Sequence, residues 1–455
     1  PRASQIDATV WVDDQKQRKV ELLYREPDPH RPISHYRPPF ANTYVVDSRV
    51  YDDPIVKGWL PWQPGGEHDI RVRVRLRKDV KGADDDPILE DRVKLTGPKG
   101  AKVFDAGWKD YKAVVLSESA GVDREAEPVE LVLAFYADQA GNLANDVRVV
   151  AVDPKSHAIT EVPSQVYDIR HDVLTEDQGA VDEAIRHPGV PIWVPTVTAR
   201  VAFQADLPAR QSRVYLVYHN NPDAGAASYE STLTAGGPNP GLLVDAEKKI
   251  VDKPRFTIEN DKIEVRLHPL AGVIDELVLK SRPKHELYHH METNGAIHWS
   301  PEAYPPPRPW AHMSDWKEPK FKVVKGPVMV QTHASGPMPY VPEVNASVSY
   351  RVYAGQPYII TETAMRVEES LAVQALRNGE VVFKRGLLTH VAWYDAVRDR
   401  VQTYDLETLA DLDELLMDKD VPWITFYNPE TRVAFGGIQL GSANGGLEHR
   451  PRVLN

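Results

Sequence analysis

The chain has 455 residues, of which 42% are hydrophobic and 26% charged, and its formal net charge is −12. This length predicts two or three domains, because a single hydrophobic core rarely serves a chain so long. The negative net charge argues against non-specific nucleic-acid binding, which depends on clustered Lys and Arg. The chain contains no cysteine, which excludes disulfides, thiolate metal ligands and cysteine nucleophiles.

The ends of the chain bear on its location. It starts at Pro1 instead of Met, and we interpret this start as the product of signal-peptide removal, so we expect a secreted or periplasmic protein. No apolar run is long enough to predict a transmembrane segment. A Gly-rich stretch at 441–446 lies just before the last residues, which leaves open whether the chain is a fragment of a longer protein.

One basic run stands out near the N-terminus. Arginine alternates with apolar residues from Arg71 to Arg77, a pattern that places four arginines on one face of a strand. We interpret this face as a solvated one that pairs with acidic neighbours. A face that binds an anionic ligand is the alternative.

Strand signals dominate the rest of the chain, and they favour an all-β sandwich architecture over alternating strands and helices. The predicted strands are short, rich in Val, Ile and Tyr, and bounded by turn residues. Helices are predicted at 406–417, from the leucine spacing, and more weakly at 176–186. The best strand candidates are 71–76, 129–135, 147–152, 198–203, 214–218, 262–267, 328–332, 347–353 and 358–365.

Turn-rich sequence between residues 220 and 255 predicts a domain boundary, since Gly, Pro and Asn leave no room there for regular structure. We therefore expect an N-terminal β-sandwich region at 1–225, either as one module or as two modules split near 153. We also expect a linker at 226–255 and a second β-domain at 256–455, either whole or truncated at its C-terminus.

Two stretches resemble known sugar-active proteins. Residues 201–218 resemble the last strands of β-sandwich modules that precede larger sugar-active domains. Residues 256–267, with the pattern F-x-I-x-N-x-x-x-E-V-x-L, and the Gly turn and strand at 272–280 resemble the opening of galactose-mutarotase-like β-supersandwich domains. Such domains occur in polysaccharide lyases, family 38-type α-mannosidases and aldose epimerases. The resemblance implies a supersandwich from 256 onwards, and it transfers no catalytic residue.

The stretch from Tyr288 to Tyr340 is rich in His, Trp and Tyr and follows no clean period. Long irregular segments in compact domains are often functional. Trp299, Trp310 and Trp316 fit a sugar-binding surface, because aromatic rings stack on the apolar faces of pyranoses. The alternative is that these tryptophans cover the sandwich core.

The histidines of this stretch have three possible roles. His298 fits general acid or base chemistry. A divalent metal at His289, His298 and His312 is possible, but their spacing matches no standard zinc signature, and no cofactor is firmly implied. Ordinary polar loop histidines are the third alternative.

Further candidates lie beyond this stretch. Gly336 to Tyr340 reads as a stiff turn that presents Tyr340. The Asn-Gly turn at 378–379 is flanked by Arg377 and Glu380, which suit either carboxylate recognition or a surface ion pair. On a predicted strand at 387–394, His390 and Tyr394 share a face, which suits an acid/base pair or a polar face in solvent.

We interpret the chain as an exported carbohydrate-active enzyme, most concretely a polysaccharide lyase that cleaves an acidic glycan by β-elimination. In this mechanism His390 or His298 is the base, Tyr340 or Tyr304 is the acid, and Arg377 binds the uronate carboxylate. The predicted substrate-binding residues are Trp299, Trp310, His312, Trp316, Arg377, Glu380 and Tyr394.

Two alternatives remain. One is a non-catalytic glycan-binding or scaffold protein of a surface glycan-capture system. The other is a glycoside hydrolase, which needs two carboxylates across a cleft. The candidate carboxylates are Glu292, Glu302, Glu343, Glu362 and Glu380.

Overall fold

The computed structural model describes residues 6–12, 15–16, 21–23, 55–57, 67–76, 78, 89–96, 107–156, 158–176, 193–241, 254–280, 285–288, 302–377, 386–410, 414–417, 421–440 and 452–454. The described residues are nearly all β-structure, in several antiparallel sheets, which confirms the predicted all-β class. The mutarotase-like supersandwich remains a prediction. The described helical turns are η4 (Ala137–Gln139), α1 (Leu143–Asp146), η6 (Met313–Asp315) and η7 (Leu406–Thr408).

The chain divides into two compact units. Unit 1 comprises Pro1–Val162, Val166–Ala227 and Leu440–Glu448, and unit 2 comprises Pro163–Gln165, Ser228–Gln439 and His449–Asn455. The domain limits predicted from the sequence, including the possible split near 153, remain predictions.

The N-terminal sheet of unit 1 has the strand order β2-β1-β5-β6. Its strand β5 contains the predicted strand 71–76. Two further short strands, β3 and β4, pair with each other. The strands are β1 (Ile6–Val12), β2 (Gln15–Lys16), β3 (Glu21–Leu23), β4 (Ile55–Lys57), β5 (Glu67–Leu76) and β6 (Leu89–Thr96).

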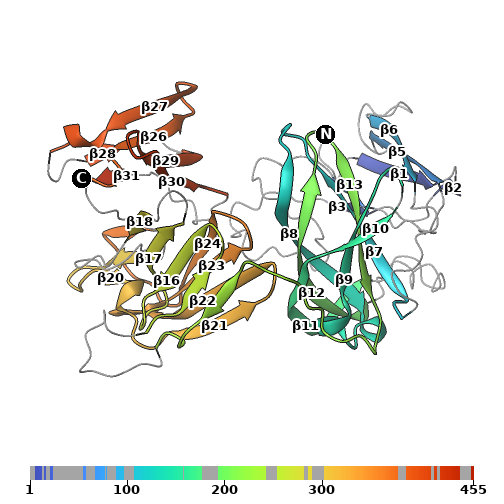
Figure 1. Cartoon of the computed structure of the whole chain (residues 1–455), viewed down its shortest axis with the longest axis horizontal. Helices are drawn as coiled ribbons and strands as arrows, with labels where there is room; N and C mark the ends of the chain where they lie inside the picture. The colour runs from blue at the N-terminus through green and yellow to red at the C-terminus, as the bar shows by residue number, and fades with distance from the viewer. Residues whose placement is uncertain are drawn as a thin grey trace. The chain divides into compact units, whose positions relative to one another are not determined.

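A β-sandwich forms the larger part of unit 1 (Figure 1). The β13 sheet has the order β10-β9-β13-β7, and the β12 sheet has the order β11-β12-β8. Every second residue of β12, including Val201 and Phe203, packs in a core with Tyr215 and Val217 of β13. The strands are β7 (Asp110–Ser117), β8 (Arg124–Tyr136), β9 (Arg148–Val152), β10 (Ile159–Val162), β11 (Ser164–Glu176), β12 (Trp193–Leu207) and β13 (Ser212–His219).

The β13 sheet is covered on both faces. Val150 and Leu216 point away from the sandwich core and form a second cluster with Val152 and Tyr218. Every residue of β9 is buried for this reason. A strand buried on both faces has a continuous apolar run, which is why 149–152 does not alternate in the sequence.

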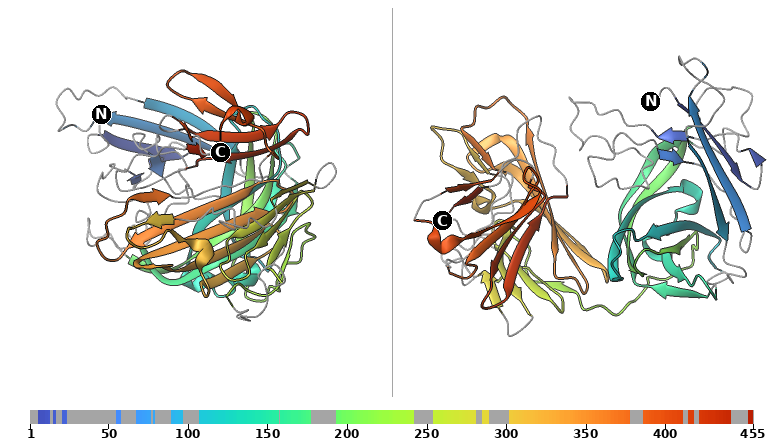
Figure 2. Two further views of the ribbon diagram at one scale, coloured as in Figure 1. Left: turned by 90° about the vertical axis from the view of Figure 1, so that its left-hand side faces the viewer. Right: turned by 90° about the horizontal axis from the view of Figure 1, so that it is seen from above.

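Unit 2 has its main core between two sheets. The charged sheet has the order β14-β15-β16-β17-β18, and the meander sheet has the order β21-β22-β23-β24. Figure 2 shows the yellow-to-orange strands of this unit as broad twisted layers. The strands are β14 (Thr234–Gly236), β15 (Thr257–Glu259), β16 (Ile263–Leu267), β17 (Ile274–Leu279), β18 (His285–Tyr288), β21 (Lys320–Lys325), β22 (Met329–Met338), β23 (Val341–Tyr353) and β24 (Ile359–Val367).

Two buried polar groups join these sheets. The backbone N–H of Ile274 on β17 donates to the Tyr350 hydroxyl on β23 at 3.4 Å, and burial raises the pKa of that phenol. Asn260 accepts the N–H groups of Lys262 and Ile263 and donates to the carbonyls of Tyr353 and of Gln356. The Asn of the F-x-I-x-N pattern therefore closes the β15–β16 turn and ties it to the end of β23.

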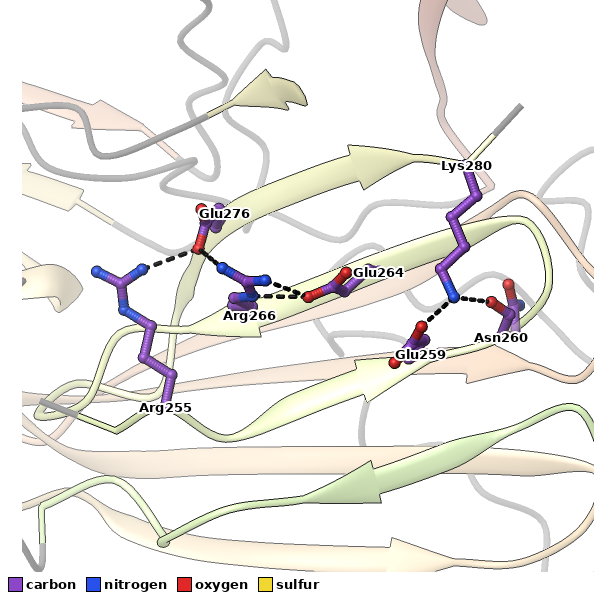
Figure 3. A network of polar contacts seen from close by, with 7 residues as sticks. All are labelled: Arg255, Glu259, Asn260, Glu264, Arg266, Glu276 and Lys280. Atoms are coloured by element: carbon purple, nitrogen blue, oxygen red, sulfur yellow. Dashed lines mark hydrogen bonds and ion pairs between the residues drawn. The ribbon is translucent and has the colours of Figure 1, made fainter. Parts of the chain in front are cut away.

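The other face of the charged sheet carries a network of ions (Figure 3). Glu276 is 1% exposed and accepts hydrogen bonds from Arg255 at 2.9 Å and Arg266 at 3.0 Å. Arg266 also pairs with Glu264, and Lys280 donates to the Asn260 carbonyl at 2.6 Å. The buried carboxylate is thus compensated by two guanidinium groups, as buried charges must be.

Three smaller sheets complete unit 2. The aromatic sheet, named for Tyr304 and Trp310, has the order β20-β19-β25, the C-terminal sheet has the order β27-β26-β29-β30, and β28 pairs with β31. The strands are β19 (Glu302–Tyr304), β20 (Ala311–His312), β25 (Ala375–Arg377), β26 (His390–Asp395), β27 (Arg400–Asp405), β28 (Glu414–Leu416), β29 (Trp423–Asn428), β30 (Val433–Ile438) and β31 (Arg452–Leu454).

The helix predicted at 406–417 is wrong. Only the 3₁₀ turn η7 forms at its start, where the Asp405 carboxylate accepts the Glu407 N–H. Residues 414–416 instead form β28, which pairs with β31 close to the end of the chain. The weaker helix prediction at 176–186 lies outside the described residues, except for the strand residue Glu176. Among the helices of the described chain, none is long and apolar enough to cross a membrane.

Candidate functional site

The candidate site is one face of the aromatic sheet. In its register Glu302 pairs with His312 on one side and with Arg377 on the other, while Tyr304 pairs with Ala375. Residues two apart on a strand share a face, so Glu302 and Tyr304 lie on the same side. The opposite side carries Ala303 and Ala311, which are buried in the main core of unit 2.

Three rings are stacked in a row on this face. The rings of Tyr304 and Trp310 have centroids 5.0 Å apart and an interplanar angle of 11°. The rings of Trp310 and His312 follow at 6.1 Å and 30°. All three residues are partly exposed. Such a row places apolar ring carbons beside a polar ring nitrogen, the two kinds of group that a sugar ring requires of a binding surface.

A buried carboxylate lies at the end of this row. Glu302 is 0% exposed, and its Oε1 lies 3.2 Å from Nδ1 of His312, whose side chain is 18% exposed. A carboxylate this close to Nδ1 favours the protonated form of an imidazole. The pair is therefore suited to moving a proton through the other ring nitrogen.

Two contacts hold the segment between β19 and β21 against the meander sheet. Arg308 donates to both carboxylate oxygens of Glu343, at 2.7 and 2.6 Å, and its hydrogen bond lowers the pKa of Glu343 to about 2. Trp316 donates from its indole to the carbonyl of Pro337 at 2.7 Å. These contacts position the rings, because they fix the backbone on both sides of Trp310.

The predicted turn at Tyr340 is shorter than the sequence suggested. Gly336 to Met338 belong to strand β22, and only Pro339 and Tyr340 form the turn. Tyr340 has a φ of 62° and is 57% exposed. Its carbonyl accepts a 3.5 Å hydrogen bond from Arg308, so its backbone lies beside the segment that holds Trp310.

Three of the predicted aromatic and histidine residues lie elsewhere. Trp316 is 6% exposed and packs in the core of unit 2, as the core interpretation of these tryptophans expected. His390 lies on β26 of the C-terminal sheet, where its Nδ1 is 2.8 Å from the Thr389 hydroxyl and its ring lies against Tyr427. Tyr394, on the same strand, donates to Asp399.

Part of the prediction falls on residues that the structure does not describe. His298 and Trp299 as well as Glu380 lie outside the described residues, and Arg377 is placed through its backbone register alone. Of the three histidines predicted as metal ligands, only His312 is described. Among the described residues, no three His, Asp or Glu side chains gather as metal ligands.

The sequence did not reveal which carboxylate accompanies which histidine. Glu302 was one of several candidate carboxylates, and its register with His312, ten positions away, depends on strand pairing that no spacing rule predicts. A second polar pair was missed altogether: His333 Nδ1 lies 2.8 Å from the Ser349 hydroxyl on the meander sheet. Burial lowers the pKa of His333, with a contribution from the charge of Lys322.

Comparison with known proteins gives little. No family model matches the sequence, and no curated protein matches it. An α-mannosidase from Enterococcus faecalis V583 aligns at 12% identity with a TM-score of 0.39, over 77% of this chain and 43% of that one. A protein in glycosyl hydrolase family 38 from the same species aligns at 10% identity and a TM-score of 0.39, over 71% and 38%. The chain thus spans less than half the length of either protein, and similarity this weak defines no function.

Proposed function

We propose that the protein is a carbohydrate-active enzyme and that the aromatic sheet is its substrate platform. The observation that carries this proposal is the stack of Tyr304, Trp310 and His312 beside the buried carboxylate of Glu302. Aromatic side chains offer apolar carbons to the C–H groups of a pyranose, and an imidazole beside a carboxylate supplies a proton acceptor next to them. The proposal includes export, since polymeric glycans are met outside the cytoplasm.

Within this class, β-elimination of a uronate polymer is the first mechanism. His312 removes the proton on C5, the electron pair forms the C4–C5 double bond, and the C4–O bond breaks. Tyr304 then returns a proton to the leaving oxygen. Arg377, opposite Glu302 in the register, is the candidate for the uronate carboxylate. His312 thus takes the role of base that the sequence suggested for His298 or His390.

Hydrolysis is the second mechanism, because the site also contains carboxyl groups. Asp315 lies in η6, which directly follows β20. Loss of solvent around its carboxyl group raises the pKa of Asp315, although the charges of His312 and Lys317 act against this. A carboxyl group with a raised pKa is a suitable proton donor to a glycosidic oxygen, and Glu302 would be the second carboxylate.

One assay separates these mechanisms. Purified protein is incubated with uronate polymers and with neutral polysaccharides, and both ultraviolet absorbance and new reducing ends are followed. Elimination produces an absorbing double bond together with the reducing end, whereas hydrolysis produces the reducing end alone. A protein that binds a glycan in the same buffer but releases neither product would instead be the non-catalytic glycan-binding protein.

Matched variants then test the site. His312→Asn should lower kcat by about 10²–10⁴-fold, the usual contribution of a general acid or base, and Trp310→Ala should raise KM. His390→Asn, on the C-terminal sheet, is the control and should leave both constants unchanged. Activity lost with His390→Asn and retained with His312→Asn would refute this site and favour the His390–Tyr394 pair.

A further inference from the structure

The N-terminal sheet of unit 1 concentrates cations on one face. Its register sets Arg71 between Trp11 and Arg92, and Arg73 between Thr9 and Glu90. Residues at these positions share a face because neighbouring strands pair side chain to side chain. The same face continues to Arg75, opposite Asp7, and to Lys94, opposite Asp69.

Two of these arginines are neutralised by carboxylates. Arg73 donates to both oxygens of Glu90 at 3.0 and 3.1 Å, and Arg92 donates to both oxygens of Asp69 at 2.7 and 2.8 Å. The hydrogen bond from Arg92 lowers the pKa of Asp69, so this carboxylate is ionised at neutral pH. The sequence interpretation of a face that pairs with acidic neighbours therefore describes these two arginines.

Arg71 differs from them. Its guanidinium carbon lies 4.3 Å from the centre of the Trp11 ring, and that of Arg73 lies 5.5 Å from the same ring. Among the described residues, Nε of Arg71 makes no hydrogen bond, and the carboxylate on which its charge acts, Asp69, is already bonded to Arg92. A guanidinium that lies on an indole loses little conformational entropy when it binds a ligand. Its remaining N–H groups are spaced to match the two oxygens of a carboxylate.

The composition of this face points to a particular kind of ligand. The whole chain has a net charge of −12, so the excess of Arg and Lys here is local. Arginine recognises carboxylates in bidentate fashion, and the indole of Trp11 holds the guanidinium groups of Arg71 and Arg73 in place for such contacts. A polymer that carries a carboxylate on each sugar residue can pair with several cations of this face at once.

We propose that this face, centred on Arg71 and Trp11, is an accessory binding surface for a uronate-bearing polysaccharide. The proposal deepens the proposed function and rests on it for the identity of the polymer. It assigns the substrate class as anionic and places polymer capture on a sheet whose residues are distinct from those of the aromatic sheet. Capture at such a surface raises the local concentration of polymer for the enzyme.

The test measures binding of the full chain to polygalacturonate, with dextran as the neutral comparison and a DNA oligonucleotide as the non-sugar polyanion. Wild-type protein should bind polygalacturonate, more weakly as salt increases, and should not bind dextran or DNA comparably. Arg71→Gln should weaken binding about tenfold or more, as loss of a charge-assisted bidentate contact does. The affinity of Arg71→Lys for polygalacturonate should lie between those of the wild type and Arg71→Gln.

Arg170→Gln is the matched control, because it removes the same charge from unit 1 at an exposed arginine that is paired with Asp168. It should bind as wild type does. Should Arg71→Gln fold poorly, Lys94→Gln removes an exposed cation from the same face and should still weaken binding about two- to threefold. No binding of polygalacturonate, equal binding by all variants, or equal binding of DNA would each overturn the proposal.

Turnover is measured separately on short oligosaccharides. Failure of the His312 variants to change activity would refute the proposed site while binding through Arg71 stands. Loss of Arg71-dependent binding with unchanged turnover of short substrates is the expected pattern. Binding that depends on Trp310 and not on Arg71 would refute the accessory surface alone.

Discussion

Replacing Glu276 with glutamine should cost unit 2 about 3 kcal/mol of stability. The carboxylate is 1% exposed and accepts hydrogen bonds from Arg255 and Arg266 at 2.9 and 3.0 Å. At an effective dielectric constant of about 20, each contact at this distance represents roughly 5 kcal/mol of attraction, most of which offsets desolvation. Leaving a buried charge without its partner costs about 3–5 kcal/mol. In the variant, Arg255 still forms an ion pair with Asp275 at 3.2 Å. We therefore expect a loss of stability at the lower end of this range.

Denaturant unfolding of the full chain measures this loss, with hydrogen exchange assigning the transition to unit 2, because two units need not unfold together. Glu264→Gln is the matched control. Glu264 contacts Arg266, whose side chain is 39% exposed, so its loss should cost less than about 1 kcal/mol. Equal effects of the two variants, or a loss below 1 kcal/mol for Glu276→Gln, would refute the reasoning.

Two further predictions concern pH and backbone conformation. Burial lowers the pKa of His219 to about 4, with a contribution from the charge of Lys112. Above about pH 6.5 this histidine is neutral in both states, and between pH 6.5 and 4 only the unfolded chain takes up the proton, so stability should fall by up to about 3 kcal/mol in that window. His219→Gln should flatten this part of the stability profile, and an unchanged profile would contradict the assignment. Gly237 has a φ of +107°, and a Cβ there would lie 2.3 Å from the carbonyl oxygen of Arg255. Gly237→Ala should therefore lower stability by more than about 2 kcal/mol, whereas Gly225→Ala, where a Cβ meets nothing within 4 Å, should be close to neutral; thermal unfolding of both variants is the measurement.

The strands were predictable because their residues carry the pattern themselves. Val201 and Phe203 occupy alternate positions of β12 between Arg200 and Gln204, and the continuous apolar run at 149–152 reflects a strand buried on both faces. The register was not predictable. Glu302 and His312 become neighbours because β19 and β20 pair, and that pairing cannot be predicted from the local sequence.

The incorrect prediction of a helix at 406–417 also arose because strand pairing cannot be predicted from local sequence. Leucines spaced three and four apart satisfy a helical period, yet Leu415 packs beside Val391 and Trp393, and its strand pairs with β31. Tertiary pairing outweighed a propensity that differs by only a few tenths of a kcal/mol per residue. In the site, an aromatic surface could be suspected from composition, and core packing was the stated alternative for each tryptophan, but nothing in the sequence indicated that Trp316 would be the buried one.

The place of β13 in its sheet has a consequence for the order in which the chain can fold. This strand lies between β7 and β9, although both precede it by dozens of residues in the chain. During synthesis, β7 and β9 therefore each have an unpaired edge until β13, which ends at residue 219, has left the ribosome. Unpaired strand edges can form hydrogen bonds with other molecules and so promote aggregation. The meander sheet pairs each strand with the next one in sequence and faces no such delay. The β-sandwich of nascent unit 1, more than the meander sheet, is where a cell would need a chaperone.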